Sequence, residues 1–285
     1  MKIIYIGSSS PLSLIPLKFL IKSDHEVCAV AVDNDRNSDF NVITSSSIQS
    51  LAFNNSISLI SLNTNCLNAS SKIEEFQPDV IIVSCYARRL PQSILSLARK
   101  GSFNVHPSLL PKFRGPNPLF WQLREGVKEY GVTLHRMTND FDAGDIISQK
   151  KVNIDDGLYI DDVTDMLASQ AADLIIDTLG DIESDSLVEL TQNKKHSSYQ
   201  SNPEKDDYTV STSWTAKRLY NFINAYKGLD VYFLCDIYGE KYKLTDAFSC
   251  QEVPHKNMNN KSIVIDEEKI TFSCKDGYIQ CGFKV

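Results

Sequence analysis

Short apolar runs alternate with segments of helical period along the first hundred residues. The run at 2–6 ends at Gly7, and Leu12, Ile15 and Phe19 then recur with the spacing of a helix face. Further apolar runs follow, each separated from the next by a helical or polar segment: 27–32, 57–62, 79–85 and 103–106. Strands buried on both faces form continuous Val and Ile runs, and helices between them imply parallel crossovers. The pattern therefore predicts a doubly wound, Rossmann-like α/β domain with a mostly parallel sheet.

The pattern changes after this part of the chain. Apolar runs at 131–137 and 146–154 predict two more strands, and residues around 160–180 have the period of a long helix. Residues 191–213 are polar with almost no apolar periodicity, so we interpret them as a linker. We expect the main domain to span residues 1–190.

The C-terminal end has the pattern of a small β-rich domain. After a short helix at 215–226, short alternating segments are typical of strands, and hairpin turn signals occur at Tyr238-Gly239 and Lys275-Asp276-Gly277. This predicts a small antiparallel β domain over 214–285.

Composition excludes several classes of protein. The 285 residues carry a net charge of −7, so the overall field does not attract phosphate backbones or anionic lipid. Seven scattered cysteines, never spaced as Cys-x-x-Cys, argue against a disulfide framework or a structural zinc site and indicate a reducing, cytoplasmic environment. No apolar stretch approaches the ~18 residues of a membrane span. We expect no membrane association and no metal.

The segment 104–118, NVHPSLLPKFRGPNP, carries the first candidate chemistry. Asn104 and His106 are two apart on a predicted strand, so they share a face, and the chain then enters a loop punctuated by proline. Ligands of doubly wound sheets bind at the carboxyl ends of the strands, where these residues lie. A lone histidine is more often a satisfied structural residue, but the neighbouring Asn104 raises the chance of a functional site. The first strand lacks a G-x-G-x-x-G turn, so the fold alone does not imply a dinucleotide.

A second cluster lies in the segment 131–147. Asp140, Asp142 and Asp145 lie in one short loop with Gly144. Such loops are mostly solvated turns, and the ligand spacing of an EF-hand is absent. His135, on the preceding strand, could equally be a core residue or face a substrate.

An amide, an imidazole and a carboxylate together suit acyl or formyl transfer to an amine. Asn104 would donate a hydrogen bond to the oxyanion. His106 would accept the proton of the amine or stabilise the oxyanion as an imidazolium, held by Asp142. A Ser-His-Asp hydrolase is a competing interpretation, but Ser108 lies in a proline-rich loop and not in a G-x-S-x-G elbow.

The sequence resembles the formyltransferases that use 10-formyltetrahydrofolate. This family contains methionyl-tRNA formyltransferases, glycinamide ribonucleotide transformylases and the N-formyltransferases of nucleotide-linked amino sugars. The matching segments occur in the family's order: Asn104-Val105-His106, Ser108-Leu109-Leu110-Pro111, Arg114-Gly115, Gly131-Val132-Thr133 and Asp142-Ala143-Gly144. The resemblance covers residues 1–190 well. It is weaker over the β-rich end, although this end looks like the small carboxyl-terminal barrel of several members.

The resemblance implies the following roles. Asn104, His106 and Asp142 match the family's catalytic trio, and Ser108 and Arg114 are expected to bind the substrate. The family holds the pterin of 10-formyltetrahydrofolate largely through backbone atoms of two loops. The residues expected to bind it are Tyr86, Arg88, Arg89, Leu90, Thr138, Asn139 and Asp140. At least one of the two arginines could instead be an ordinary solvated charge.

The acceptor is expected to be a small amine. Methionyl-tRNA enzymes typically have a basic loop after the second strand, whereas 32–47 contains one Arg among three acids. Residues 207–285 carry ten Lys and Arg and ten Asp and Glu, so no net positive charge is available to bind phosphates. The segments at 106–108 and 131–137 look closer to the sugar-nucleotide enzymes, which favours a nucleotide-linked 4-amino sugar destined for surface polysaccharide. Aromatic residues at 214–226 could stack on the nucleotide base, although such a stripe is more often core.

Alternatives stay open at this level. The protein could formylate methionyl-tRNA, hydrolyse 10-formyltetrahydrofolate with water as the nucleophile, or bind folate as a regulator without turnover. A homodimer is compatible with the sequence.

Overall fold

The computed structural model describes residues 1–33, 47–62, 67–253 and 262–284. These residues form two compact units. Unit 1 contains Met1–Pro118, Tyr130–Val152 and Thr164–Gln200, and unit 2 contains Leu119–Glu129, Asn153–Val163 and Ser201–Val285. Two short segments of the first two hundred residues thus belong to unit 2. The domain boundaries expected at residues 190 and 213 stay a prediction.

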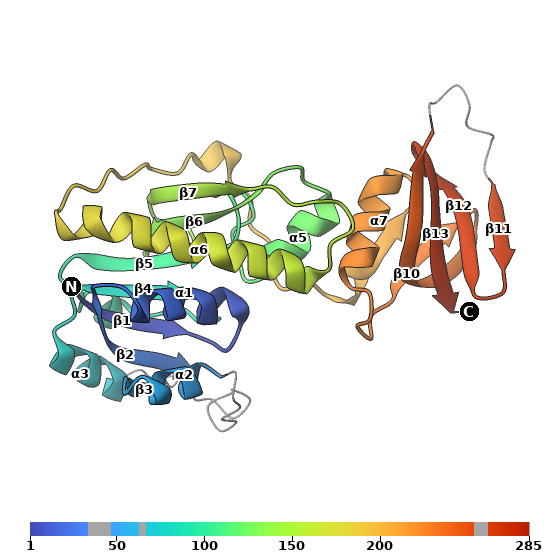
Figure 1. Cartoon of the computed structure of the whole chain (residues 1–285). Coiled ribbons are helices and arrows are strands. Elements are labelled where there is room, and N and C mark those ends of the chain that lie inside the picture. The colour runs from blue at the N-terminus through green and yellow to red at the C-terminus, as the bar shows by residue number, and fades with distance from the viewer. Residues whose placement is uncertain (34–46, 63–66, 254–261, 285) are drawn as a thin grey trace. The chain divides into compact units, whose positions relative to one another are not determined.

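Unit 1 is built around a seven-stranded sheet with the order β3-β2-β1-β4-β5-β6-β7 (Figure 1). Its strands are β1 (Lys2–Gly7), β2 (Glu26–Asp33), β3 (Ser58–Leu62), β4 (Val80–Ser84), β5 (Gly101–His106), β6 (Tyr130–Arg136) and β7 (Ile146–Val152). The strands from β3 to β5 pair in parallel, and β6 and β7 are antiparallel to their neighbours. The mostly parallel sheet predicted from the sequence is confirmed.

Helices cover both faces of this sheet. They are α1 (Pro11–Ile21), α2 (Ile48–Asn54), α3 (Leu67–Phe76), α4 (Gln92–Leu95) and α6 (Ile160–Glu183). On one face, Ile4 and Ile6 of β1 pack in a cluster with Ile73 of α3 and Ile94 of α4. On the other face, the Tyr5 hydroxyl donates to a carbonyl oxygen of α1. Alternate residues of one strand therefore face different helices, as its continuous apolar sequence predicts.

Unit 2 contains a six-stranded sheet with the order β11-β12-β13-β10-β9-β8 (Figure 1). Its strands are β8 (Thr209–Ser211), β9 (Phe233–Ile237), β10 (Glu240–Glu252), β11 (Ile263–Asp266), β12 (Lys269–Cys274) and β13 (Gly277–Lys284). Its helical segments are α5 (Pro118–Glu125), η3 (Lys205–Tyr208) and α7 (Ala216–Ala225), and η2 (Lys194–His196) lies in unit 1. The predicted turns at Tyr238-Gly239 and Lys275-Asp276 join β9 to β10 and β12 to β13. Only β8 pairs in parallel, because α7 separates it from β9 and no tight hairpin joins the two strands.

Aromatic side chains form the core of unit 2. Phe222 of α7 is fully buried, and its ring centroid lies 5.4 Å from that of Phe120 and 5.0 Å from that of Phe233. Tyr208 and Tyr226 complete the cluster. Phe222 and Tyr226 are therefore core residues, whereas Trp214 and Tyr220 are half-buried, and a stacking role for those two stays a prediction. Among the described helices, none is long and apolar enough to cross a membrane.

Truncating the centre of this cluster should destabilise unit 2. Phe222→Ala leaves a cavity and should lower the free energy of unfolding by roughly 3–5 kcal/mol. Phe248→Ala, at a side chain of the same unit that is 40% exposed, is the matched control and should lower it much less, because surface substitutions usually change it by about 0.5 kcal/mol or less. Trp121 and Trp214, the two tryptophans of the chain, both lie in unit 2, so their fluorescence during urea unfolding reports this unit. Equal unfolding midpoints for the two variants would contradict the assignment of Phe222 to the core.

Candidate active site

The register of β5 and β6 brings the first candidate residues together. The two strands are antiparallel, with Asn104 opposite His135 and His106 opposite Thr133. Directly opposed residues lie on the same face of a sheet, so the His135 ring lies beside the Asn104 amide. The ring centroids of His106 and His135 are 6.5 Å apart.

Asp142 reaches these residues from the loop between β6 and β7. Its backbone is in the left-handed region, with φ 51°. Gln192 stabilises the loop, because its Nε2 donates hydrogen bonds to the carbonyl oxygens of Asp142 at 2.8 Å and Gly144 at 2.6 Å. A Cβ at Gly144 would lie 1.9 Å from the carbonyl oxygen of Arg136, so only glycine allows the loop to approach β6 this closely.

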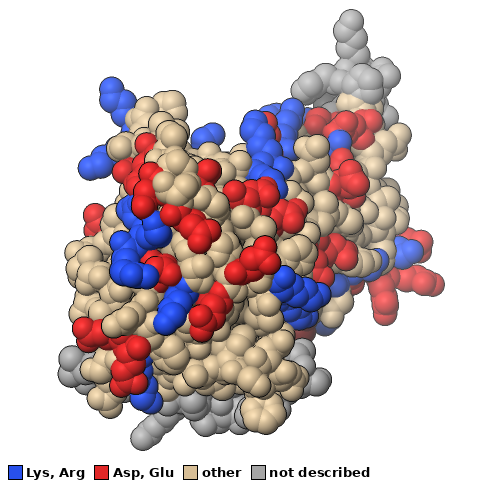
Figure 2. Space-filling model, turned by 60° about the vertical axis from the view of Figure 1, so that its left-hand side comes forward, with Lys and Arg blue, Asp and Glu red and all other residues tan. Residues whose placement is uncertain are grey.

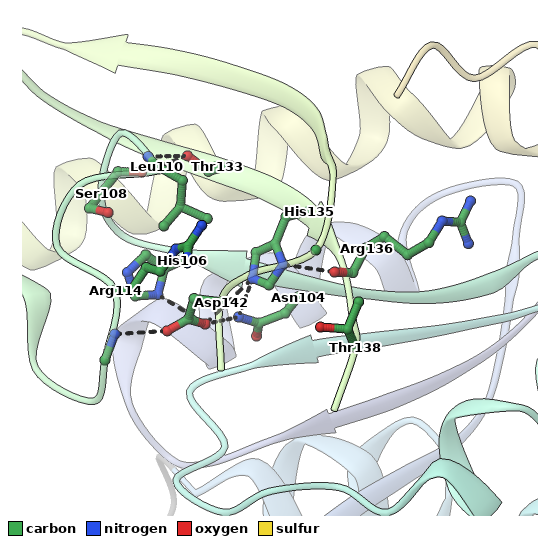
Figure 3. Close-up of polar contacts among 12 residues, drawn as sticks. Asn104, His106, Ser108, Leu110, Arg114, Thr133, His135, Arg136, Thr138 and Asp142 are labelled. Carbon is green, nitrogen blue, oxygen red and sulfur yellow. Dashed lines mark hydrogen bonds and ion pairs between the residues drawn. The ribbon is translucent and has the colours of Figure 1, made fainter. Parts of the chain in front are cut away.

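The Asp142 carboxylate lies at the centre of the cluster (Figure 3). Its Oδ1 lies 3.6 Å from His106 Nδ1, 3.5 Å from His135 Nε2 and 3.5 Å from Asn104 Nδ2. Its Oδ2 accepts a hydrogen bond of 2.9 Å from the backbone N–H of Gly115. The structure thus brings together the three residues expected to form the trio, and adds His135 to them.

The surroundings keep Asp142 ionised. Burial by itself would raise the pKa of this carboxyl, but the imidazoles of His106 and His135 and the N–H of Gly115 hold the pKa well below its ordinary value. Burial lowers the pKa of His106, although the charge of Asp142 opposes this change. The resting site therefore contains a carboxylate beside a neutral His106.

The hydrogen bond of His106 decides which of its nitrogens is available. Nε2 lies 2.7 Å from the carbonyl oxygen of Phe113, which can only accept, so Nε2 carries the proton of the neutral ring. Nδ1 then holds the lone pair and faces Asp142. The free basic nitrogen of His106 is consequently Nδ1.

The loop that follows β5 is held internally. The Ser108 hydroxyl is buried and donates to the carbonyl oxygen of Lys112 at 2.8 Å. Arg114 donates to Gln192 Oε1 through Nε and NH2, at 3.2 and 2.7 Å. Gly115 has φ +113°, and a Cβ there would lie 2.0 Å from the carbonyl oxygen of Gln200. Neither of the two residues expected to bind substrate lines the pocket described next: Ser108 is used inside its own loop, and Arg114 acts on Gln192.

An open pocket is lined in part by Asn104, His135 and Asp142. The seven residues expected to bind folate all line it, and they come from the loop after β4 and the loop after β6: Tyr86, Arg88, Arg89, Leu90, Thr138, Asn139 and Asp140. Val83, Met137 and Phe141 add apolar surface. His106 is absent from the lining, because it is buried behind Asp142.

The two arginines of the pocket differ in their contacts. Arg88 forms an ion pair of 2.8 Å with Asp33 at the end of β2. The Arg89 guanidinium carbon lies 5.1 Å from the centre of the Phe141 ring. An ion-paired cation and a cation stacked on an aromatic ring flank the same apolar surface, which suits a flat, polar-edged ring system such as a pterin.

Three features of the site could not be predicted from the sequence. His135 was left open, because its position opposite Asn104 depends on the antiparallel register. The carbonyl oxygen of Phe113 and the amide of Gln192 carry no sequence signal, since the chain places them by non-local packing.

No group of three or more His, Cys, Asp or Glu side chains in the described ranges is arranged to hold a metal ion.

The stability of the protein should reveal the buried charge of Asp142. A carboxyl whose pKa is lowered on folding stabilises the protein above its unfolded pKa of about 3.9, and this contribution is lost as the pH falls toward the folded value. Asp142→Asn should therefore lower the free energy of unfolding at neutral pH by roughly 1.5–3 kcal/mol, as for a hydrogen-bonded charge. The difference should shrink below about pH 4 in urea titrations. Asp145→Asn in the same loop is the control, and a deficit independent of pH would refute the ionised state of Asp142.

Comparisons with known proteins identify relatives. A sequence profile described as formyl transferase matches residues 1–179. The methionyl-tRNA formyltransferase of Syntrophomonas wolfei is 30% identical over 228 residues, which cover 79% of this chain and 72% of that protein. The methionyl-tRNA formyltransferase of Alkaliphilus oremlandii is 33% identical over 226 residues, which cover 78% and 72%.

Solved structures share the fold over the full length. An N-formyltransferase from Helicobacter canadensis, solved with folinic acid and dTDP-3-aminofucose, has a TM-score of 0.74 and 22% identity, and the match covers 100% of both chains. The sugar 3-N-formyltransferase WlaRD, solved with dTDP and 5-N-formyl-THF, has a TM-score of 0.70 and 21% identity, over 100% of this chain and 98% of that one. At these identities the likeness concerns the fold. Because the profile matches more than half of the chain and curated relatives align over more than two thirds of it, the chain belongs to the formyl transferase family of formyl-transferring enzymes.

Proposed function

We propose that this protein transfers a formyl group from 10-formyltetrahydrofolate to the primary amine of a nucleotide-linked amino sugar. One observation carries the proposal. The Asn104 amide and the Asp142 carboxylate open into the same pocket as all seven residues expected to bind the folate. A donor held there would be next to the Asn104 amide, the Asp142 carboxylate and the His135 imidazole, with His106 buried beyond the lining.

The chemistry of the pocket fits the donor. Leu90, Val83 and Phe141 offer apolar surface to a flat ring, and the exposed loop at 138–140 offers backbone groups to its polar edge. The donor supplies the formyl carbon and a leaving nitrogen. The chain has to supply orientation, a hydrogen-bond donor for the formyl oxygen and an acceptor for the amine proton.

The three trio residues divide these tasks. Asn104 donates to the formyl oxygen as that oxygen gains negative charge. Nδ1 of His106, which holds the lone pair, accepts the proton that the amine releases. The Asp142 carboxylate, 3.6 Å from Nδ1, stabilises the imidazolium that results. No covalent intermediate with the chain is needed.

The charge of unit 2 favours a small acceptor over tRNA. Residues 207–285 carry ten basic and ten acidic residues. On the face of the molecule shown in Figure 2, which is formed largely by unit 1, acidic and basic side chains are likewise interspersed. Binding of tRNA depends on neutralising phosphates with a basic surface. The full-length fold likeness to two sugar N-formyltransferases supports the same choice.

We infer that residues 1–190 form the formyltransferase domain and residues 214–285, after the 191–213 linker, an appended domain.

Formylation of methionyl-tRNA is the second candidate. It is supported by the curated relatives, which are 30% and 33% identical to this chain. Hydrolysis of the folate would use the same side chains with water as the nucleophile, and formate released without any amine would reveal it. A folate-binding regulator would bind the donor but produce no tetrahydrofolate with any amine.

An acceptor panel separates these functions. With 10-formyltetrahydrofolate as the donor, we expect tetrahydrofolate formation to depend on a dTDP- or UDP-linked 3-amino or 4-amino sugar. Methionyl-tRNA should be a poor acceptor at physiological salt. Transfer to methionyl-tRNA with a steep salt dependence, and none to the sugars, would establish the second candidate instead.

Substitutions in the trio should separate turnover from binding. Asp142→Asn and His106→Ala should each lower kcat by roughly 10²-fold or more, because each removes a part of the proton-accepting pair. Folate binding, measured by fluorescence titration, should remain mostly intact. Asp145→Asn and the exposed His196→Ala are matched controls of the same residue types. Near-normal kcat in both trio variants would remove the catalytic assignment.

A further inference from the structure

The hydrogen bonds of His135 determine its tautomer. Nδ1 lies 2.9 Å from the carbonyl oxygen of Arg136, and a carbonyl oxygen can only accept. Nδ1 therefore carries the proton of the neutral ring, and Nε2 holds the lone pair. In His106 the assignment is reversed, because Nε2 donates to Phe113. The two imidazoles of the site are opposite tautomers.

The lone pair of His135 in turn orients the amide of Asn104. Nε2 lies 3.1 Å from Asn104 Nδ2, so an N–H of the amide donates to this lone pair. The second N–H of the amide faces Asp142 Oδ1 at 3.5 Å. Both N–H groups are thus directed at His135 and Asp142, and Figure 3 shows the Asn104 oxygen turned away from the His135 ring.

This orientation is unsuited to stabilising an oxyanion. On its free side Asn104 presents a carbonyl oxygen, which repels negative charge and can accept a hydrogen bond from an amine. To donate to the formyl oxygen, the amide has to turn over by about half a rotation, as terminal amide torsions are broad and roughly two-fold. Something must therefore release the amide nitrogen from His135.

A proton on Nε2 would have this effect. The protonated nitrogen is a donor, and an amide N–H 3.1 Å away would then be a second donor facing it. Opposed donors in a buried place are unfavourable, whereas the turned amide would offer its oxygen to Nε2–H. Asp142 Oδ1, 3.5 Å from Nε2, would stabilise the charged ring.

We propose that His135 is a positioning residue whose protonation at Nε2 turns the Asn104 side-chain amide over, so that its N–H groups face the pocket only when the ring is charged. The proposal deepens the formyl-transfer function and rests on it for its catalytic meaning, but the coupling itself is a property of the free protein. The step forms one N–H bond, with a proton taken from solvent onto the Nε2 lone pair, and rotates one amide.

Several titratable and charged groups face this ring. Asp142 Oδ1, from the loop after β6, lies 3.5 Å from Nε2. The ring of His106, from β5, has its centroid 6.5 Å away. The guanidinium of the adjacent Arg136 is paired with Glu189. Arg88, Arg89 and Asp140 line the same pocket.

Nitrogen NMR of the ligand-free, full-length protein tests the coupling without any substrate. Long-range ¹H–¹⁵N spectra at mildly alkaline pH should show His135 as the Nδ1–H tautomer and His106 as the Nε2–H tautomer. The two rings are assigned by the signals lost in His135→Gln and His106→Gln, and the exposed His196 is the reference. An Nε2–H tautomer at His135 would overturn the proposal at once.

A pH titration then tests the rotation of the amide. The side-chain ¹⁵NH₂ signals of Asn104, assigned by their loss in Asn104→Ala, should shift with the same midpoint as protonation of His135. The shift should persist in His106→Gln and vanish in His135→Gln. Asn104 signals that ignore the titration of His135, or a His135 that stays neutral down to acid unfolding, would refute the switch.

The kinetic readout distinguishes positioning from simple support. In His135→Gln the log kcat–pH profile should lose one ionisation that the wild type shows, whereas a merely structural role would lower the whole profile and keep its shape. If no formyl transfer is detectable, the NMR results still decide the coupling. If the coupling fails, the transfer assay still decides the function.

Discussion

The site depends on one buried carboxylate. Transferring a charge out of water is unfavourable unless hydrogen bonds and opposite charge compensate, so the chain has to supply partners for Asp142. It does so with the Gly115 N–H from the loop after β5, with the Asn104 amide and the His106 imidazole of β5, and with the His135 imidazole of β6. A side chain at position 115 would collide with the carbonyl of Gln200, so this close approach needs glycine. One charge therefore ties two loops and two strands of unit 1 together.

Local patterns made the outline of this site predictable, and long-range pairing made its details unpredictable. Asn104 and His106 could be placed on one face because the side-chain period of a strand is two. The apolar runs at 79–85 and 103–106 correctly gave adjacent parallel strands, since continuous Val and Ile are typical of strands buried on both faces. The register that sets His135 against Asn104 joins residues 31 positions apart, and no local preference encodes it.

The folate-binding residues were reached by resemblance, and the structure supplies the physical reason why their side chains say little. Thr138, Asn139 and Asp140 are exposed, and the Thr138 hydroxyl and the Asp140 backbone bond to each other. If this loop binds folate through its backbone, as the resemblance implies, many side-chain sequences would present the same groups. Ser108 shows a different limit of the sequence. The resemblance implies that it binds substrate, and the structure adds that its buried hydroxyl donates to the Lys112 carbonyl, because a buried hydroxyl needs a partner. Substrate binding by Ser108 stays a prediction.

The relatives found by sequence are methionyl-tRNA formyltransferases, and those found by structure were solved with dTDP or a dTDP-linked sugar. The extent of the family match along the chain offers a reason for this difference. The family profile ends at residue 179, beyond Asn104, His106 and Asp142 but before α7 and every strand of the second sheet. Donor chemistry can be shared across the family because it needs only this part of the chain. Choice of an acceptor adds a further requirement, and for tRNA that requirement is a positive field strong enough to displace counterions. The balanced charge of residues 207–285 does not provide such a field, and this is the physical ground on which we propose a small nucleotide-linked amine as the acceptor.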